Sequence, residues 1–242
     1  MDEVSKIVKV GPLYFDLTLI GMVLLTCLLV FLFVFICSRN LQMKPKGKQN
    51  VLEWIIEFVK NILSDNLSKK EVGNFHLFSF TMFLFILFSN IIGLILKIEI
   101  HQNGEAVSFW KSPTADPIVT LTLGALTILL TNYVGIKKFG FKKFFNNGYM
   151  QPVSFLLPIK LMEDLTNILT LGLRLYGNIF AGEVLLTLIA KMAHAKGLIS
   201  YIPAIPLEMI WQGFSLFIGA MQAYIFVTLS SVYLSHKVET EH

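Results

Sequence analysis

The sequence predicts an all-α polytopic membrane protein with five transmembrane helices and one interfacial amphipathic helix. Of its 242 residues, 55% are hydrophobic and only 15% are charged, and the mean hydropathy is +0.67. Several apolar runs reach about 20 residues, the length that a helix needs to cross the hydrocarbon core. A soluble domain does not combine these properties. No linker or low-complexity tract divides the chain, so residues 1–242 are predicted to form a single membrane domain.

The hydropathy pattern places five spans along the chain. They cover about residues 13–37, 76–97, 117–136, 161–190 and 204–235. The first run is too long for the apolar region of a signal peptide and lacks an A-x-A cleavage site, so we interpret it as a span. Cys27 and Cys37 both lie in this run, which favours core or lipid-facing residues over a disulfide. Pro117, directly after Asp116, fits the start of the third helix.

Residues 50–67, between the first two spans, have the pattern of an amphipathic helix. Its apolar face consists of Leu52, Ile55, Ile56, Val59, Ile62 and Leu63. The charged residues lie largely on other faces of this helix. We expect it to lie in the cytoplasmic membrane interface, with an ordinary loop helix as the alternative.

The distribution of lysine and arginine predicts the orientation of the chain. Two loops carry four cations each: Arg39, Lys44, Lys46 and Lys48 after the first span, and Lys137, Lys138, Lys142 and Lys143 after the third. By the positive-inside rule these loops are cytoplasmic, so the N-terminus is outside and the C-terminus is cytoplasmic. The net charge of +4 follows from this topology and does not indicate nucleic-acid binding.

Arg174 lies in the middle of the apolar run from 168 to 190. A guanidinium at the centre of a membrane helix costs about 2.5 to 3.5 kcal/mol on insertion scales, and arginine does not escape this cost by losing its charge. On the same helix, Glu163 lies about 16 Å before it and Glu183 about 14 Å after it. Glu163 and Asn178 fall within about 40° of the Arg174 direction, whereas Glu183 points about 180° away. Two acids on different faces indicate two separate polar entrances.

The last span carries a polar stripe on an otherwise apolar helix. Glu208, Ser215 and Gln222 recur every seven residues. Gln212 and Gly219 fill the four-residue steps between them. Buried amides and hydroxyls need partners, which a facing helix or a hydrated path could supply.

Structural explanations of the same residues remain open at this point. Arg174 could belong to a buried ion pair with Glu163 or Glu183. The polar stripe could consist of hydrogen bonds between helices, and Glu183 and Glu208 could be solvated residues near helix ends. A secondary transporter and a structural assembly subunit are rival functions, although no internal repeat of the kind found in transporters is visible. An enzyme with a catalytic site or cofactor is not expected, because no nucleotide-binding loop, metal motif or nucleophile-base pair is present.

Two strings resemble subunit a of bacterial F-type ATP synthases, also called subunit 6. They are LGLRLYGNIFAGE at 171–183 and MQAYIF at 221–226. The strings FSNIIGLI at 88–95, SPTADPIVTLTL at 112–123 and MEDLTN at 162–167 extend the resemblance over most of the chain. The resemblance implies a proton-translocating stator with two offset half-channels. These load and unload the carboxylates of a rotating c-ring, which couples proton flow to ATP synthesis or hydrolysis. It also implies that the last two helices are long and tilted.

The resemblance assigns a role to each polar residue. Arg174 matches the essential arginine that separates the half-channels. The extracytoplasmic half-channel would contain Asn178, Glu183 and Gln222, and the cytoplasmic mouth would contain Glu163 and Asp164. Where several relatives have His or Glu, this chain has Ser215, whose hydroxyl does not exchange a proton near neutral pH. We therefore expect the relay to use Glu183, water or Glu208.

The resemblance also implies the surroundings of the chain. The expected partners are the c-subunit ring, the b-subunit stalk, other ATP synthase subunits and the lipid bilayer of a bacterial plasma membrane, without nucleic acid, metal or cofactor. Protons are the expected coupling ion. Sodium remains the alternative, because the ligands that distinguish the two ions lie mainly on the c subunit.

Overall fold

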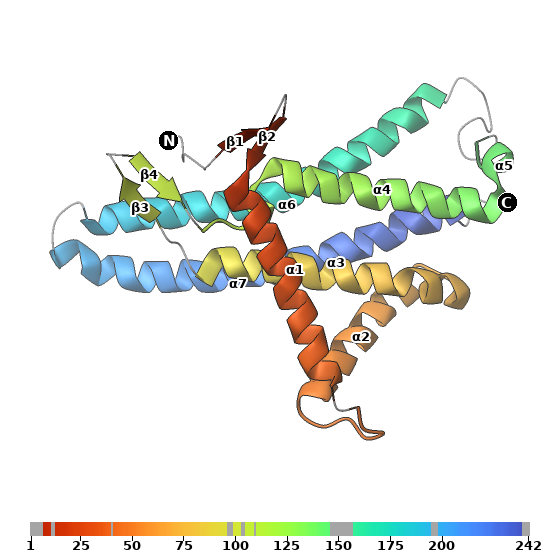
Figure 1. The fold of residues 1–242 in the computed structure, drawn as a ribbon, viewed down its shortest axis with the longest axis horizontal. Coiled ribbons are helices and arrows are strands. Elements are labelled where there is room, and N and C mark those ends of the chain that lie inside the picture. The colour runs from red at the N-terminus through yellow and green to blue at the C-terminus, as the bar shows by residue number, and fades with distance from the viewer. Residues whose placement is uncertain are drawn as a thin grey trace. The chain divides into compact units, whose positions relative to one another are not determined.

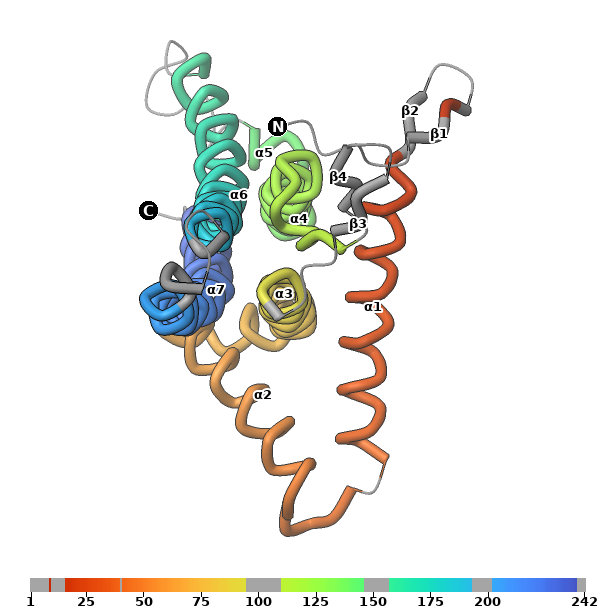
Figure 2. The backbone as a smooth tube through the Cα atoms, turned by 90° about the vertical axis from the view of Figure 1, so that its left-hand side faces the viewer, coloured from red at the N-terminus to blue at the C-terminus, as the bar shows by residue number. Residues whose placement is uncertain are grey.

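The computed structural model describes residues 7–10, 13–39, 41–95, 99–102, 105–108, 110–145, 157–194 and 198–238. In chain order the elements are β1 (Ile7–Val10), β2 (Leu13–Asp16), α1 (Leu17–Ser38), α2 (Lys48–Ser64), α3 (Lys69–Ile95), β3 (Glu99–Gln102), β4 (Glu105–Ser108), η1 (Pro113–Ala115), α4 (Pro117–Phe139), α5 (Phe141–Phe145), α6 (Leu157–His194) and α7 (Leu198–Val238). Figure 1 shows them as a ribbon, and Figure 2 traces the backbone from the side. Five helices, α1, α3, α4, α6 and α7, are long and apolar enough to cross a membrane, which confirms the predicted all-α membrane fold.

The structure adds two short antiparallel hairpins that were not predicted, β1–β2 and β3–β4. The first helix therefore begins at Leu17 and not at residue 13, because residues 13–16 form β2. Asp16 ends this strand and caps α1: its Oδ1 accepts hydrogen bonds from the N–H groups of Thr18 (2.9 Å) and Leu19 (3.2 Å). Four-residue strands are too short to stand out in a hydropathy window of about 19 residues.

The chain divides into two compact units, and α3, α6 and α7 contribute residues to both. The first unit comprises residues 1–39, 84–116 and 176–222, and the second comprises residues 40–83, 117–175 and 223–242. Each unit is described by itself below. The predicted single membrane domain and the tilt of α6 and α7 stay predictions.

In the second unit, α2 buries its apolar face against protein. Val59 and Leu63 are both 0% exposed. The Phe58 ring contacts Phe83 of α3 and Tyr224 of α7, with ring centroids 5.7 Å and 5.9 Å apart. The amphipathic pattern of this helix is thus satisfied by packing on α3 and α7, and its place in the membrane interface stays a prediction.

Also in the second unit, α4 and α6 approach closely where each helix has a glycine. A Cβ on Gly124 would lie 2.9 Å from the Ile168 carbonyl oxygen, and a Cβ on Gly172 would lie 2.9 Å from Leu121 Cα. Both distances are shorter than a Cβ contact allows, so this crossing requires glycine on both helices. On the part of α6 that belongs to the first unit, a Cβ on Gly177 would meet no described atom within 4 Å, so Gly177 makes no such close approach to a described residue.

In the first unit, Asn90 of α3 is a buried residue that joins three segments. Its Nδ2 donates to the Gly219 carbonyl oxygen of α7 (2.8 Å), and its Oδ1 accepts from Thr114 Oγ1 of η1 (2.7 Å). Ser112 Oγ donates to the Ser89 carbonyl oxygen at 2.9 Å. These bonds fasten η1 and α7 to α3 in a region with little water to compete for them.

Candidate functional site

Arg174 lies near the middle of α6 and is half-buried. Leu171 and Leu175 on one side of it are 0% exposed, whereas Leu173 on the other side is 48% exposed. The side chain therefore starts at the border between the buried and the exposed face of the helix. Its positive charge is close enough to Tyr233 of α7, in the same unit, to interact with it electrostatically.

Arg174 forms no ion pair or hydrogen bond through its side chain with any residue that the structure describes. Ion pairs are formed instead by Lys138 with Glu71 and by Lys237 with Asp164. The described residues thus do not form the buried Arg174 pair with an acid of α6 that a purely structural role requires.

A cavity of about 170 Å³ lies among α4, α5, α6 and α7 in the second unit. Its charged or titratable lining consists of Lys160, Glu163, Asp164, Tyr233, His236 and Lys237. The two acids predicted at the cytoplasmic mouth thus share one cavity with three basic side chains. A space of this size accommodates several water molecules, each of which takes up about 30 Å³ in the liquid.

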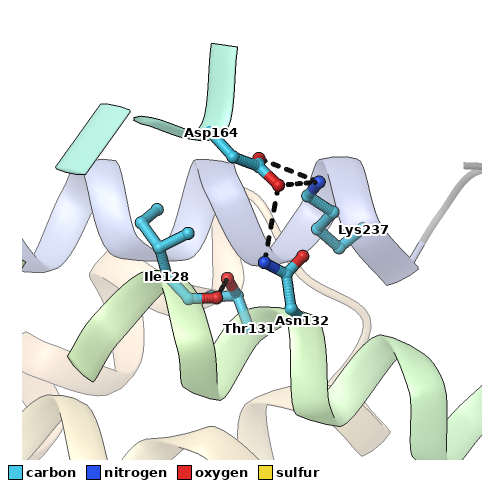
Figure 3. A network of polar contacts seen from close by, with 5 residues as sticks. All are labelled: Ile128, Thr131, Asn132, Asp164 and Lys237. Atoms are coloured by element: carbon cyan, nitrogen blue, oxygen red, sulfur yellow. Dashed lines mark hydrogen bonds and ion pairs between the residues drawn. The ribbon is translucent and has the colours of Figure 1, made fainter. Parts of the chain in front are cut away.

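Asp164 is held by side chains from two other helices (Figure 3). Lys237 Nζ of α7 lies 2.9 Å from Asp164 Oδ1 and 3.0 Å from Oδ2. Asn132 Nδ2 of α4 donates to the same Oδ2 at 3.5 Å. The side chains of the pair are only 21% and 16% exposed, so water screens their attraction less than at a surface. Asp164 therefore ties α6 to α7 and α4.

Glu163 differs from its neighbour. It is exposed, and it forms no hydrogen bond or ion pair with any described residue, although it lines the same cavity. Of the two adjacent carboxylates, only Glu163 is open to proton exchange with solvent without breaking an ion pair within the described chain.

In the first unit, the structure brings Asn178 and Gln222 together. Asn178 Nδ2 of α6 donates to Gln222 Oε1 of α7 at 2.8 Å. Gln222 is 2% exposed and Ser215 is 7% exposed, yet Gln222 Nε2 and Ser215 Oγ have no hydrogen-bond partner among the described residues. We call Asn178, Ser215 and Gln222 the polar seam. Buried polar atoms without partners cost about 1 to 3 kcal/mol each, unless water supplies the missing bonds.

The two acids predicted near the polar seam are placed differently. Glu183 is half-buried on α6, and its carbonyl oxygen accepts a hydrogen bond from Thr187 Oγ1 at 2.8 Å. Glu208 is exposed on α7 and forms no hydrogen bond or ion pair with a described residue. The seven-residue stripe is therefore buried only at Ser215 and Gln222. Residues 205–210 are all exposed.

Sequence reasoning missed Asn132, Tyr233 and Lys237. Lys237 is paired with an acid 73 positions earlier in the chain. Asn132 gave a weak signal as a lone amide in an apolar span. Periodicity relates residues of one helix to each other, but it carries no information about contacts between helices so far apart in sequence.

Comparisons with known proteins agree with the sequence resemblance. Residues 20–235 match the family model of the ATP synthase A chain. The chain is 59% identical over 241 residues to ATP synthase subunit a of Enterococcus faecalis and 58% identical over 241 residues to that of Enterococcus hirae, with 100% of each chain covered. It is also 50% identical over 246 residues to ATP synthase subunit a of Listeria monocytogenes, again with 100% of both chains covered.

Proposed function

The chain belongs to the ATP synthase A chain family, and we propose that it forms two offset half-channels that load and unload the carboxylates of a rotating c-ring. Family membership makes it a membrane subunit of a proton-translocating ATP synthase, which works with the other subunits of that complex. The c-ring and the b-subunit stalk as direct partners belong to the proposal. The observation that carries it is Arg174, a half-buried cation in an apolar helix without an ion pair among the described residues.

In this proposal, Arg174 interacts with the carboxylates of the c-ring, each of which passes it as the ring rotates. A guanidinium about 4 Å from a ring carboxylate favours its ionised form by about 4 kcal/mol at an effective dielectric near 20, or about three pKa units. A protonated ring acid that meets Arg174 therefore releases its proton. Because arginine keeps its charge, it also repels a proton that would cross directly between the half-channels. Proton passage then requires rotation of the ring.

The extracytoplasmic half-channel would use the polar seam and Glu183. Gln222 Nε2 and Ser215 Oγ offer buried polar atoms that water can satisfy, and Asn178 connects the seam to the Arg174 side of α6. Glu183 would exchange protons in place of Ser215. Glu208 lies about 10 Å along the axis of α7 from Ser215, so it would serve only at the outer entrance.

The cytoplasmic half-channel would open at the cavity that Glu163 and Asp164 line. Glu163 lies within about 20° of the Arg174 direction on the helix, so the two residues share a face of α6. A proton that leaves the ring at Arg174 would therefore meet Glu163 on the same face. Asp164 would hold the wall of the cavity through Lys237. The N-terminus would be outside and the C-terminus cytoplasmic. Each proton delivers about 2.3 kcal/mol per 100 mV, so several protons are needed for one ATP.

The proposal is tested by Arg174→Ala in the complete synthase, with ATP-driven acidification of inverted membrane vesicles as the measurement. We expect no acidification, although the complex assembles and its soluble sector hydrolyses ATP. The matched control is Arg39→Ala, since Arg39 is the other arginine of the chain and directly follows α1. Normal acidification by the Arg174→Ala complex would overturn the proposal. Loss of assembly instead of pumping would favour a structural subunit.

A further inference from the structure

The segment after α4 is a sharp turn with a defined geometry. Gly140 has φ +79°, a conformation that glycine adopts without strain, and it redirects the chain from α4 into α5 (Figure 1). Its N–H donates to the Ile136 carbonyl oxygen at 2.8 Å, and the Phe144 N–H donates to the Gly140 carbonyl oxygen at 2.9 Å. These bonds keep α5 at the end of the α4 span.

One phenylalanine of α5 is buried, and the other two are exposed. Phe144 is 6% exposed and packs where Gly135 of α4 has no side chain, since a Cβ there would collide with the Phe144 ring. Phe141 and Phe145 are 71% and 40% exposed. Their rings stack on each other with centroids 6.3 Å apart.

Three lysines lie within four residues of this aromatic pair along the chain. Lys137, Lys142 and Lys143 are exposed, and none forms a hydrogen bond or ion pair with a described residue. Lys138 is different, because its Nζ lies 3.3 Å from Glu71 Oε1. The sequence has no Asp or Glu from residue 117 to residue 145, so this segment itself supplies no negative charge to balance the lysines.

We propose that Lys137, Phe141, Lys142, Lys143 and Phe145 form a binding surface for the phosphate headgroups of anionic phospholipids. The α4 helix is apolar enough to span the bilayer, so its last turn and α5 lie at the membrane surface. Lysine clusters directly after a span attract anionic headgroups, and aromatic rings favour the boundary between headgroups and acyl chains. The two features occur together here on one short, anchored turn. We call these five residues the α5 lipid surface.

Native mass spectrometry of the purified full chain, with phosphatidylglycerol and phosphatidylcholine of equal acyl length, tests this site. The wild-type chain should retain phosphatidylglycerol in preference to phosphatidylcholine. The triple variant Lys137→Gln/Lys142→Gln/Lys143→Gln should lose phosphatidylglycerol affinity by about fivefold per lysine and keep its weak phosphatidylcholine binding. The variant Phe141→Ala/Phe145→Ala should weaken binding of phosphatidylglycerol with the charge intact.

The control variant is Lys44→Gln/Lys46→Gln/Lys48→Gln, which removes the same charge from an exposed stretch without an aromatic residue. It should bind phosphatidylglycerol as the wild-type chain does. Equal losses in the two triple variants would overturn the site in favour of general charge attraction. Unchanged binding after removal of Lys137, Lys142 and Lys143 would also overturn it and would leave an acidic protein segment as the occupant to seek.

Discussion

Arg174, Glu163 and Asp164 lie on one helix, yet their surroundings separate their roles. Asp164 is fixed by Lys237 and Asn132, whereas Glu163 is exposed in the same cavity without a partner among the described residues. Arg174 is half-buried and unpaired within the described chain. At this scale, helical spacing could predict the shared face of Glu163 and Arg174, whereas the family resemblance gave Glu163 and Asp164 the same role. Their contacts and exposure in the structure distinguish them.

The two adjacent acids provide a matched pair of variants. Glu163→Gln removes the carboxylate that is open to exchange, so passive proton flux through vesicles stripped of the soluble sector should fall at least about tenfold. Asp164→Asn removes an ion-pair partner, so it should lower the stability of the complex by about 1 to 3 kcal/mol and leave most of the flux. Proton flux and the thermal unfolding midpoint are the two measurements. The opposite assignment would follow if Asp164→Asn stopped the flux at unchanged stability.

Gln222→Leu tests the polar seam at a single buried amide. The change removes the acceptor of the Asn178 hydrogen bond and the unpartnered Nε2, so water should be excluded from the seam. We expect lower proton flux in stripped vesicles and normal assembly. Thr228→Val is the control, because Thr228 Oγ1 donates only within its own helix, to the Tyr224 carbonyl oxygen at 3.0 Å. Equal flux in the two variants would show that the seam carries no protons.

At the scale of elements, apolar runs predicted where the spanning helices lie, because a helix must satisfy its backbone in the membrane and present an apolar surface. The same signal did not predict the hairpins, whose strands have four residues each. The apolar face of α2 was correctly identified in the sequence, and five of its six residues are buried. Periodicity shows that such a face is covered, but it does not show that α3 and α7 cover it.

The crossing of α4 and α6 depends on two glycines, so Gly124→Val should destabilise the complex. A valine would collide with the backbone of α6 at Ile168, and overpacking of this kind costs about 1 to 3 kcal/mol. The measurement is the thermal unfolding midpoint of the purified complex. Gly21→Val in α1 is the control, since a Cβ there meets nothing within 4 Å. Similar midpoints for both variants would show that the close approach is not needed.

At the scale of the whole molecule, the proposed pathway residues fall into different compact units. Glu163, Asp164 and Arg174 belong to the second unit, and the polar seam belongs to the first. The lengths of α6 and α7, 38 and 41 residues, allow one helix to contribute to both units. Family membership could be predicted from strings in the sequence, and the family match over residues 20–235 and the 59% identity to a relative over 241 residues confirm it. The partner of Arg174 could not be found in this way, since the proposal places it on another chain.

The most direct test of the proposed role of Arg174 is a cryo-EM structure of the complete synthase, in which the distances from its guanidinium to the nearest carboxylates are measured. We expect a carboxylate of the c-ring within about 4 to 6 Å of the guanidinium, the range in which an opposite charge favours ionisation. A salt bridge from Arg174 to Glu163 or Glu183 of its own chain, with no ring carboxylate in that range, would contradict it.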